Sequence, residues 1–365
     1  MKLALICRPL TFHGGVETAT IGLVRELVRR GHAIDFLTTG KGESVPGTTV
    51  RRLSVVRQPS VIRVLSFALA ARRITSAGSY DIVQSHERTM DQDIYRAGEG
   101  CHHAYLAAMG RRAGWNPHHR LVCALERRMF QLRSARHIVG ISRRGKEEIQ
   151  TLYGTASERV SLIYNGVDLR RFHPDHRAEL RGEARVSLGL ADESWTVLFV
   201  GSGFKRKGLG ALLQAFGQLR DSRARLVVAG RDDVRAYRTL AANLGIGDRV
   251  TWIAPRRDVE RLYAAADVVA LPALYEPFGN VHLEALASGV PVLSSAQAGG
   301  SEAIVSGQNG WVVSSPTHDR IREGLEALRD GDSARLVKAA RESAEPFTYA
   351  AQADQFEALY RELKR

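Results

Sequence analysis

The chain has 365 residues and is 44 % hydrophobic, a length too great for one ordinary core and suited to two domains. Its three cysteines lack the spacing of a disulfide framework or a zinc site, so a reducing compartment is expected. No apolar run approaches the length of a membrane span, and the apolar start is too short for a signal peptide and is typical of a buried strand.

The positive charge of the chain, +13 in all, is concentrated in its first half. Residues 1–168 hold 25 Lys and Arg against 14 Asp and Glu, a net charge of +11, whereas the remainder carries only +2. This asymmetry predicts an anionic partner for the first half. Nucleic acid, an acidic membrane leaflet and a phosphorylated substrate are the candidates.

Short β-branched runs alternate with amphipathic stretches along the chain, a pattern typical of a parallel α/β fold. The predicted strands are 2–7, 33–37, 50–55, 81–84, 136–141, 160–164, 195–201, 225–230, 250–253, 267–271 and 310–313, with one more after Pro291. The predicted helices include 16–30, 61–76, 209–219, 234–244, 281–288 and 347–364. A turn at 165–168 ends the first half.

Candidate site residues of the first half follow predicted strands. Gly14 and Gly15 precede a helix N-terminus, where glycines let a phosphate approach the backbone, although a plain turn is the alternative. His86 directly follows a strand, a favourable place for a site residue. Glu99 lies between two glycines, so we expect a ligand to approach it closely.

An Asp-x-Asp pair, Asp91 and Asp93, has the spacing of a metal motif. Its expected strand–turn context is absent, so we predict surface or acceptor contacts and no metal.

The stretch Arg111–Lys146 is the most basic part of the chain, since Glu126 is its single acid. The apolar residues Leu121, Leu125 and Leu132, together with Val122 and Met129, form a helical apolar stripe within it. Such a basic amphipathic helix can lie on an anionic membrane surface, or it can pack on the domain with its arginines solvated.

Two cations, Arg206 and Lys207, immediately precede a predicted helix in the loop SGFKRKG. Cations together with helix amides form an anion site suited to a diphosphate, although a solvated loop remains possible on sequence alone. A P-loop would need Lys where Leu209 stands, and a dinucleotide fingerprint would need Gly at position 206.

Residues 271–293 predict a buried strand, a turn, a helix and a second buried strand. Glu276 lies in the turn and Glu284 on the helix, beside the crevice at the carboxyl end of a parallel strand, where open α/β sheets bind ligands. Carboxylates accept hydrogen bonds from vicinal hydroxyls, and helix amides suit a phosphate, so this stretch could hold a sugar nucleotide from both ends. The alternative is that both acids are solvated.

The paired glutamates, with the intervening PFGNVHLE and the following ALASGVPVL, resemble the signature of retaining GT-B glycosyltransferases of family 4. The GG pair near the start, NGVD at 165–168, FKRKG and the closing helix extend this resemblance over nearly the whole chain. It implies two Rossmann-like domains facing each other across a cleft: an acceptor domain, 1–168, onto which the helix 347–365 packs, and a donor domain, 169–346.

The resemblance also implies roles for single residues. Arg206 and Lys207 would bind the donor phosphates without a metal or other cofactor, Glu276 would contact the sugar, and Glu284 the ribose. The remaining members of the implied donor-binding set are Gly14, Gly15, Phe278, Gly279, Asn280 and Val281. Many family members carry Arg where Ser202 stands, which leaves Arg206 to supply the guanidinium, as in the subgroup that glucosylates the lipopolysaccharide inner core.

The expected reaction is transfer of a hexose, glucose from UDP-glucose, to a membrane-held phosphorylated glycolipid such as lipopolysaccharide inner core. The donor phosphate, His86 and Glu99 are the candidates for taking the acceptor's proton. The enzyme is expected at the cytoplasmic face, held peripherally by Arg111–Lys146.

Three alternatives differ in function. The first is a family member acting on another polysaccharide or a small-molecule acceptor. A nucleic-acid-binding protein is disfavoured because the charge lies in one domain and the other carries paired acids. A GT-B phosphorylase is disfavoured because no lysine for pyridoxal phosphate lies between Lys207 and Lys338.

Overall fold

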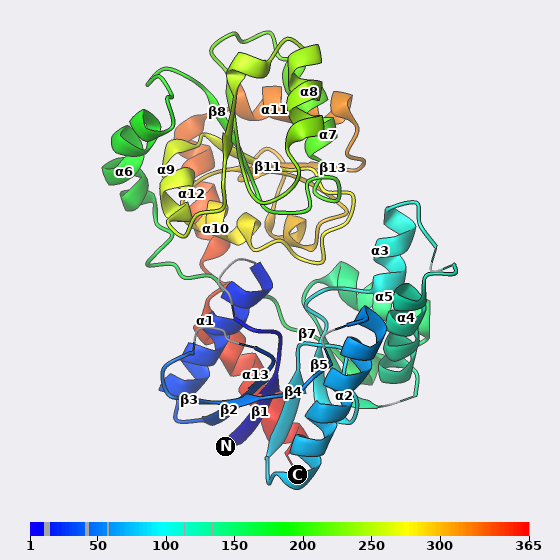
Figure 1. Cartoon of the computed structure of the whole chain (residues 1–365). Coiled ribbons are helices and arrows are strands. Elements are labelled where there is room, and N and C mark those ends of the chain that lie inside the picture. Colours follow the sequence, from blue (N-terminus) through cyan, green and yellow to red (C-terminus); the bar gives the residue numbers. More distant parts are fainter. Residues whose placement is uncertain (11–14, 41–43, 57, 113, 133, 365) are drawn as a thin grey trace. The chain divides into compact units, whose positions relative to one another are not determined.

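The computed structural model describes residues 1–10, 15–40, 44–56, 58–112, 114–132 and 134–364 (Figure 1). Internal contacts divide the chain into two units, Met1–Gly166 with Tyr349–Arg365, and Val167–Thr348. The sequence-based boundaries at 168 and 347 lie two residues from this division.

The first unit is built on a seven-stranded parallel sheet in the order β3-β2-β1-β4-β5-β6-β7. Its strands are β1 Lys2–Ile6, β2 Ala33–Thr38, β3 Thr48–Arg52, β4 Ile82–Ser85, β5 Gln92–Arg96, β6 Ala135–Gly140 and β7 Val160–Leu162. Its helices are α1 Gly15–Arg29, α2 Ser60–Ala77, α3 His102–Ala108, α4 Pro117–Phe130, α5 Arg143–Tyr153 and α13 Tyr349–Leu363.

Strand β1 shows why this sheet is covered on both faces. Leu3 and Leu5 pack with residues of α1 and α13, whereas Ala4 and Ile6 point to the other face and pack with α2. Because successive side chains of a strand alternate, a strand buried on both faces reads as an unbroken apolar run. This explains the apolar start of the sequence.

The second unit is built on a six-stranded parallel sheet in the order β10-β9-β8-β11-β12-β13. Its strands are β8 Thr196–Val200, β9 Arg225–Ala229, β10 Val250–Ile253, β11 Val268–Leu271, β12 Val292–Ser295 and β13 Gly310–Val313. Its helices are α6 Pro174–Ser187, α7 Leu209–Gly217, α8 Arg235–Asn243, α9 Val259–Ala265, α10 Val281–Ala287, α11 His318–Arg329 and α12 Ser333–Ala344.

Each sheet has a switch point at which the strand order reverses, between β1 and β4 in the first unit and between β8 and β11 in the second. Ligands of open α/β sheets bind outside the carboxyl ends of the strands at such points. Arg8 and His86 follow the two strands of the first switch point. The loops ending in Lys207 and Glu276 follow those of the second.

The sequence pattern missed the strand β5, which lies between β4 and β6 with all five of its residues buried. Two of those residues are charged and obscure the apolar signal. The Asp93 carboxylate accepts from the Val83 backbone N–H at 2.9 Å and from Arg136 at 3.0 Å, and Arg96 donates to the Asn165 Oδ1 at 2.5 Å. The hydrogen-bond partners of Asp93 and Arg96 are distant in sequence, so a local pattern could not reveal this strand.

Helix α4 forms the centre of the basic stretch, and its apolar stripe faces the protein. Val122, Leu125 and Met129 are buried, and Met129 packs in a cluster with residues of β5, β6 and α5. The prediction was wrong for Leu132, which lies beyond the end of α4 and is 69 % exposed. The buried part of the stripe packs on the domain and is therefore not available for a membrane. The neighbouring Trp115 is 94 % exposed.

The closing helix α13 packs on α1 in the first unit. Phe356 and Tyr360 are buried in the same core cluster as the apolar face of α1. A Cβ added at Gly22 of α1 would lie 2.0 Å from the Cζ of Tyr349, so only glycine lets the two helices approach this closely.

We therefore predict that Gly22→Ala lowers the free energy of unfolding of the first unit by about 1–3 kcal/mol through overpacking. The matched control is Gly182→Ala in α6, where a Cβ would have nothing within 4 Å. That change should instead stabilise its helix by up to about 1 kcal/mol. Urea unfolding followed by circular dichroism measures both, and an equal effect of the two changes would contradict the packing.

Candidate functional site

The loop after β8 is held close to the loop after β11. Gly208 has a φ of +80°, and a Cβ there would lie 1.9 Å from the Pro272 carbonyl oxygen, so another residue would force the loops apart. The Leu274 backbone N–H also donates to the Arg206 carbonyl at 2.8 Å. These contacts place the cations of one loop beside the carboxylate of the other.

Arg206, Lys207 and Glu276 form one ion cluster. The Glu276 Oε2 lies 2.9 Å from the Arg206 Nη1 and 2.8 Å from the Lys207 Nζ. The side chains of Lys207 and Glu276 are only 9 % and 11 % exposed. Burial raises the pKa of Glu276, but the two cations outweigh it and lower the pKa to about 2. The cluster is thus ionised and largely dry.

Backbone hydrogen bonds fix the position of Glu276. Its N–H donates to the Gln297 carbonyl at 3.1 Å, and its carbonyl accepts from the Gly299 N–H at 2.9 Å. The next turn is held in the same way, because the Gly300 N–H donates to the Phe278 carbonyl at 2.7 Å. The predicted loop is therefore a rigid support for its carboxylate.

His282, which was not predicted as a site residue, links this loop to β12 through hydrogen bonds of its ring. Its Nδ1–H donates to the Gly279 carbonyl at 2.7 Å, which leaves Nε2 to accept from the Ser294 hydroxyl at 2.7 Å. Burial lowers its pKa to about 4, so the ring is neutral near pH 7. Its position in the predicted helix gave no signal of this role.

Glu284, on α10, has a different partner from Glu276. Tyr263 of α9 donates its hydroxyl to the Glu284 Oε2 at 2.7 Å. Burial raises the pKa of Glu284, and the tyrosine only partly offsets this. One oxygen of this carboxylate is thus fixed by Tyr263, which also escaped the sequence reading.

The remaining residues of the implied donor set belong partly to the second unit and partly to the first. Phe278 and Asn280 are buried, and Val281, the first residue of α10, is half-buried. In the first unit Gly15 is the first residue of α1, and Gly14 lies outside the described residues.

His86 is buried in the first unit with both ring nitrogens engaged. The Gln84 side-chain amide donates to its Nε2 at 2.8 Å, because the Gln84 oxygen accepts from the Tyr360 hydroxyl. The Nδ1–H then donates to the Thr20 hydroxyl at 3.0 Å. Burial and the nearby Arg96 lower the pKa of His86 well below its ordinary value. The ring links α1, β4 and α13.

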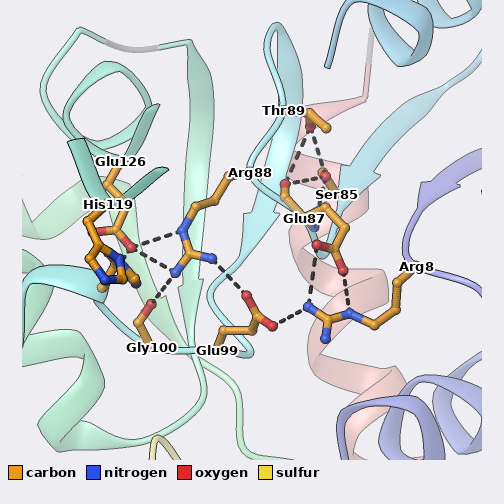
Figure 2. A network of polar contacts seen from close by, with 10 residues as sticks. Arg8, Ser85, Glu87, Arg88, Thr89, Glu99, Gly100, His119 and Glu126 are labelled. Atoms are coloured by element: carbon orange, nitrogen blue, oxygen red, sulfur yellow. Dashed lines mark hydrogen bonds and ion pairs between the residues drawn. The ribbon is translucent and has the colours of Figure 1, made fainter. Parts of the chain in front are cut away.

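Glu99 lies in the loop after β5 between two guanidinium groups (Figure 2). One of its oxygens pairs with Arg8, and the other lies 2.7 Å from the Arg88 Nη1. Burial raises the pKa of Glu99, but Arg88 and Arg8 outweigh it and lower the pKa. The carboxylate that lies between two glycines in the sequence is thus held by two ion pairs.

The two acids of the Asp-x-Asp pair point to different partners. Asp91 pairs with Arg72 of α2 at 2.7 Å, while Asp93 is held by Arg136 and the backbone of β4. Within the described ranges, His, Cys, Asp and Glu side chains do not gather in any group able to hold a metal ion. Across that same part of the chain, no helix has the length and apolar character needed to cross a membrane.

The structure thus brings Arg206, Lys207 and Glu276 into contact and places Glu284 in the first turn of α10, the helix that follows the Glu276 loop. His86 and Glu99 follow strands at the carboxyl end of the first sheet, where they belong to separate hydrogen-bond networks.

Comparison with known proteins assigns the family. Residues 13–171 match the family model described as Glycosyltransferase Family 4, and residues 181–343 match Glycosyl transferases group 1. The chain is a GT-B glycosyltransferase of the family 4 type. The resemblance on which the sequence reading relied is confirmed, and so is the predicted fold class.

Individual relatives of this glycosyltransferase span most of its length. An uncharacterised glycosyltransferase of Methanocaldococcus jannaschii is 29 % identical over 348 residues, which cover 90 % of this chain and 89 % of the relative. The lipopolysaccharide glucosyltransferase WaaG of Escherichia coli K12 is 27 % identical over 332 residues, which cover 86 % and 85 %. A crystal structure of WaaG shares the fold, with a TM-score of 0.86 and 24 % identity over 98 % of this chain and 99 % of that one.

The ion cluster of the glycosyltransferase predicts a particular pH dependence. The folded pKa of Glu276, about 2, lies below the unfolded value of about 4.3, so its stabilisation is present above about pH 5 and is lost as the pH falls toward 2. Between about pH 6 and pH 2, the free energy of unfolding of the wild type should fall by about 3 kcal/mol more than that of Glu276→Gln.

Urea unfolding at a series of pH values measures this difference. The control is Glu183→Gln, which removes an exposed carboxylate paired with Arg261 and should follow the wild type closely. Parallel pH profiles for the wild type and Glu276→Gln would contradict a buried, ionised Glu276.

Proposed function

We propose that this glycosyltransferase is retaining and metal-independent and moves glucose from UDP-glucose to a membrane-held phosphorylated glycolipid such as the lipopolysaccharide inner core. The observation that carries the donor assignment is the cluster of Arg206, Lys207 and Glu276 at the switch point of the second sheet. The choice of glucose and of a lipopolysaccharide acceptor is supported by the glucosyltransferase relative that is 27 % identical over most of the chain.

The donor diphosphate would replace Glu276 as the anion beside Arg206 and Lys207. As the bond between sugar and phosphate breaks, negative charge grows on the leaving phosphate, and two preorganised cations stabilise it without a metal ion or other cofactor. Glu276 would then accept hydrogen bonds from sugar hydroxyls, and Glu284, already aimed by Tyr263, would accept them from the ribose.

The donor phosphate itself would take the acceptor's proton. His86 is a poor candidate because both of its ring nitrogens are engaged. Glu99 is a weak base because two guanidinium groups lower its pKa. When the departing phosphate accepts the proton, the acceptor attacks on the face that the phosphate leaves, and the anomeric configuration is retained.

The first unit would bind the acceptor at the inner face of the cytoplasmic membrane, with the enzyme as a peripheral protein. The basic stretch Arg111–Lys146 presents an exposed cationic surface to phosphorylated lipid headgroups. Its exposed cations among the described residues include Arg111, Arg112, Arg120, Arg127, Arg128, Arg136 and Arg143. Nucleic acid is not proposed as a partner.

Donor binding and hydrolysis with UDP-, ADP- and GDP-glucose in the presence of EDTA tests this function. We expect UDP-glucose to bind and to be hydrolysed slowly, and Lys207→Ala to weaken both about 10- to 100-fold through loss of one charged contact. Arg206 still neutralises Glu276 in that variant, so the fold should persist.

The matched control is Lys205→Ala, which removes an exposed lysine from the same loop and should keep donor binding. Failure of every donor to bind, or a requirement for a divalent metal, would contradict the phosphate site and direct attention back to Asp91 and Asp93.

A further inference from the structure

A chain of alternating charges runs along the carboxyl end of the first sheet (Figure 2). Arg8, after β1, pairs with Glu87 at 2.9 Å and also with Glu99. Arg88 continues the chain from Glu99 to Glu126 of α4, where its Nε and Nη2 lie 3.0 and 2.9 Å from the Glu126 Oε1. This network of ion pairs thus joins the ends of β1, β4 and β5 to helix α4.

The network is more exposed at its Arg8 end than at its Glu126 end. The side chains of Arg8, Glu87 and Glu99 are 40 %, 19 % and 30 % exposed, whereas Arg88 is 11 % exposed and Glu126 is completely buried. A ligand can therefore reach the end formed by Arg8, Glu87 and Glu99. It cannot touch Glu126, which is linked to Glu99 through the Arg88 side chain.

Three residues outside α4 donate hydrogen bonds to the Glu126 carboxylate, and Arg88 is the first of them. In addition to Arg88, the His102 backbone N–H donates to its Oε1 at 2.7 Å, and the Tyr153 hydroxyl donates to its Oε2 at 2.6 Å. Burying a carboxylate is costly, and apolar residues of similar volume would hold helices together at least as well. Packing alone therefore does not account for an acid at this position.

The charges of the network show what kind of group its open end can bind. Three carboxylates face two guanidinium groups, so Arg8 and Arg88 are already neutralised and offer little to a phosphate. A carboxylate can accept about four hydrogen bonds. Each Glu99 oxygen accepts one from a guanidinium group, so the carboxylate can accept further hydrogen bonds from a ligand. Hydroxyl groups of a neutral sugar ring are the donors that such a surface suits.

We propose that Glu126 is a positioning residue for the acceptor, which fixes Glu99 through Arg88 so that Glu99 accepts hydrogen bonds from hydroxyls of the acceptor sugar. This inference rests on the proposed function, since it concerns the acceptor of that reaction. It separates two tasks in the first unit: the network binds the neutral ring, and the basic surface of α4 attracts the anionic groups.

The test is steady-state kinetics with UDP-glucose and lipopolysaccharide truncated to its inner core, on the wild type, Glu126→Gln, Glu99→Gln and the double variant. We expect Glu126→Gln to raise the acceptor KM about tenfold while the KM for UDP-glucose stays within about twofold. When Glu99 is already replaced by Gln, adding Glu126→Gln should raise the acceptor KM little further, because both changes act on the same contact between Glu99 and the acceptor.

Tyr153→Phe is the matched structural control. It removes the hydrogen bond to the other Glu126 oxygen and leaves Arg88 in place. It should lower thermal stability to a similar degree as Glu126→Gln but leave the acceptor KM unchanged, and Glu126→Asp should partly restore the acceptor KM.

Four results would overturn the inference. Additive effects of the Glu126 and Glu99 changes would show that they act independently. A rise of the acceptor KM in Tyr153→Phe, which keeps the Arg88 contact, would show that the effect of Glu126 does not depend on Arg88. If the wild type transfers glucose but Glu126→Gln has normal kinetics, the inference fails while the proposed function stands. If the wild type hydrolyses UDP-glucose but glucosylates neither this acceptor nor an alkyl glucoside, both fail together.

Discussion

The candidate donor site of the second unit depends on one ion cluster. In it the cations of Arg206 and Lys207 and the carboxylate of Glu276 neutralise one another in largely buried surroundings. A buried lysine or glutamate alone would be costly, so each side chain fixes the position of the others. The backbone supports the arrangement, because Gly208 lets the two loops meet and His282 braces the second loop. A diphosphate can enter this cluster as a substitute anion, which makes the resting ion pairs a preformed donor site.

The first unit uses charge differently at its own switch point. His86 is enclosed in a neutral hydrogen-bond chain from α13 to α1, whereas Arg8, Glu99 and Arg88 form an ionic chain that opens toward solvent at one end. The net charge of +11 in residues 1–168 therefore does not describe the sheet edge, where the arginines are already paired. Exposed cations gather instead on the surface of the basic stretch around α4.

Sequence reasoning identified most strands and the ligand-facing loops, because both sheets are parallel and their strands are apolar runs. It gave the bounds of β10 and β13. It missed β5, α3, α6, α9, α11 and α12. It placed Arg206, Lys207 and Glu276 at one site but not in contact, and it missed His282, Tyr263 and the partners of Glu99. These depend on contacts between distant segments, which local pattern does not contain.

The most direct measurement is a crystal structure of the enzyme with UDP-glucose, or a slowly hydrolysed analogue, grown in EDTA. The account predicts that the diphosphate contacts the Arg206 guanidinium and the Lys207 ammonium without a metal, and that the Glu276 carboxylate has left them for hydroxyls of the sugar. A diphosphate bound elsewhere or through a metal ion, with Glu276 still paired to both cations, would contradict it.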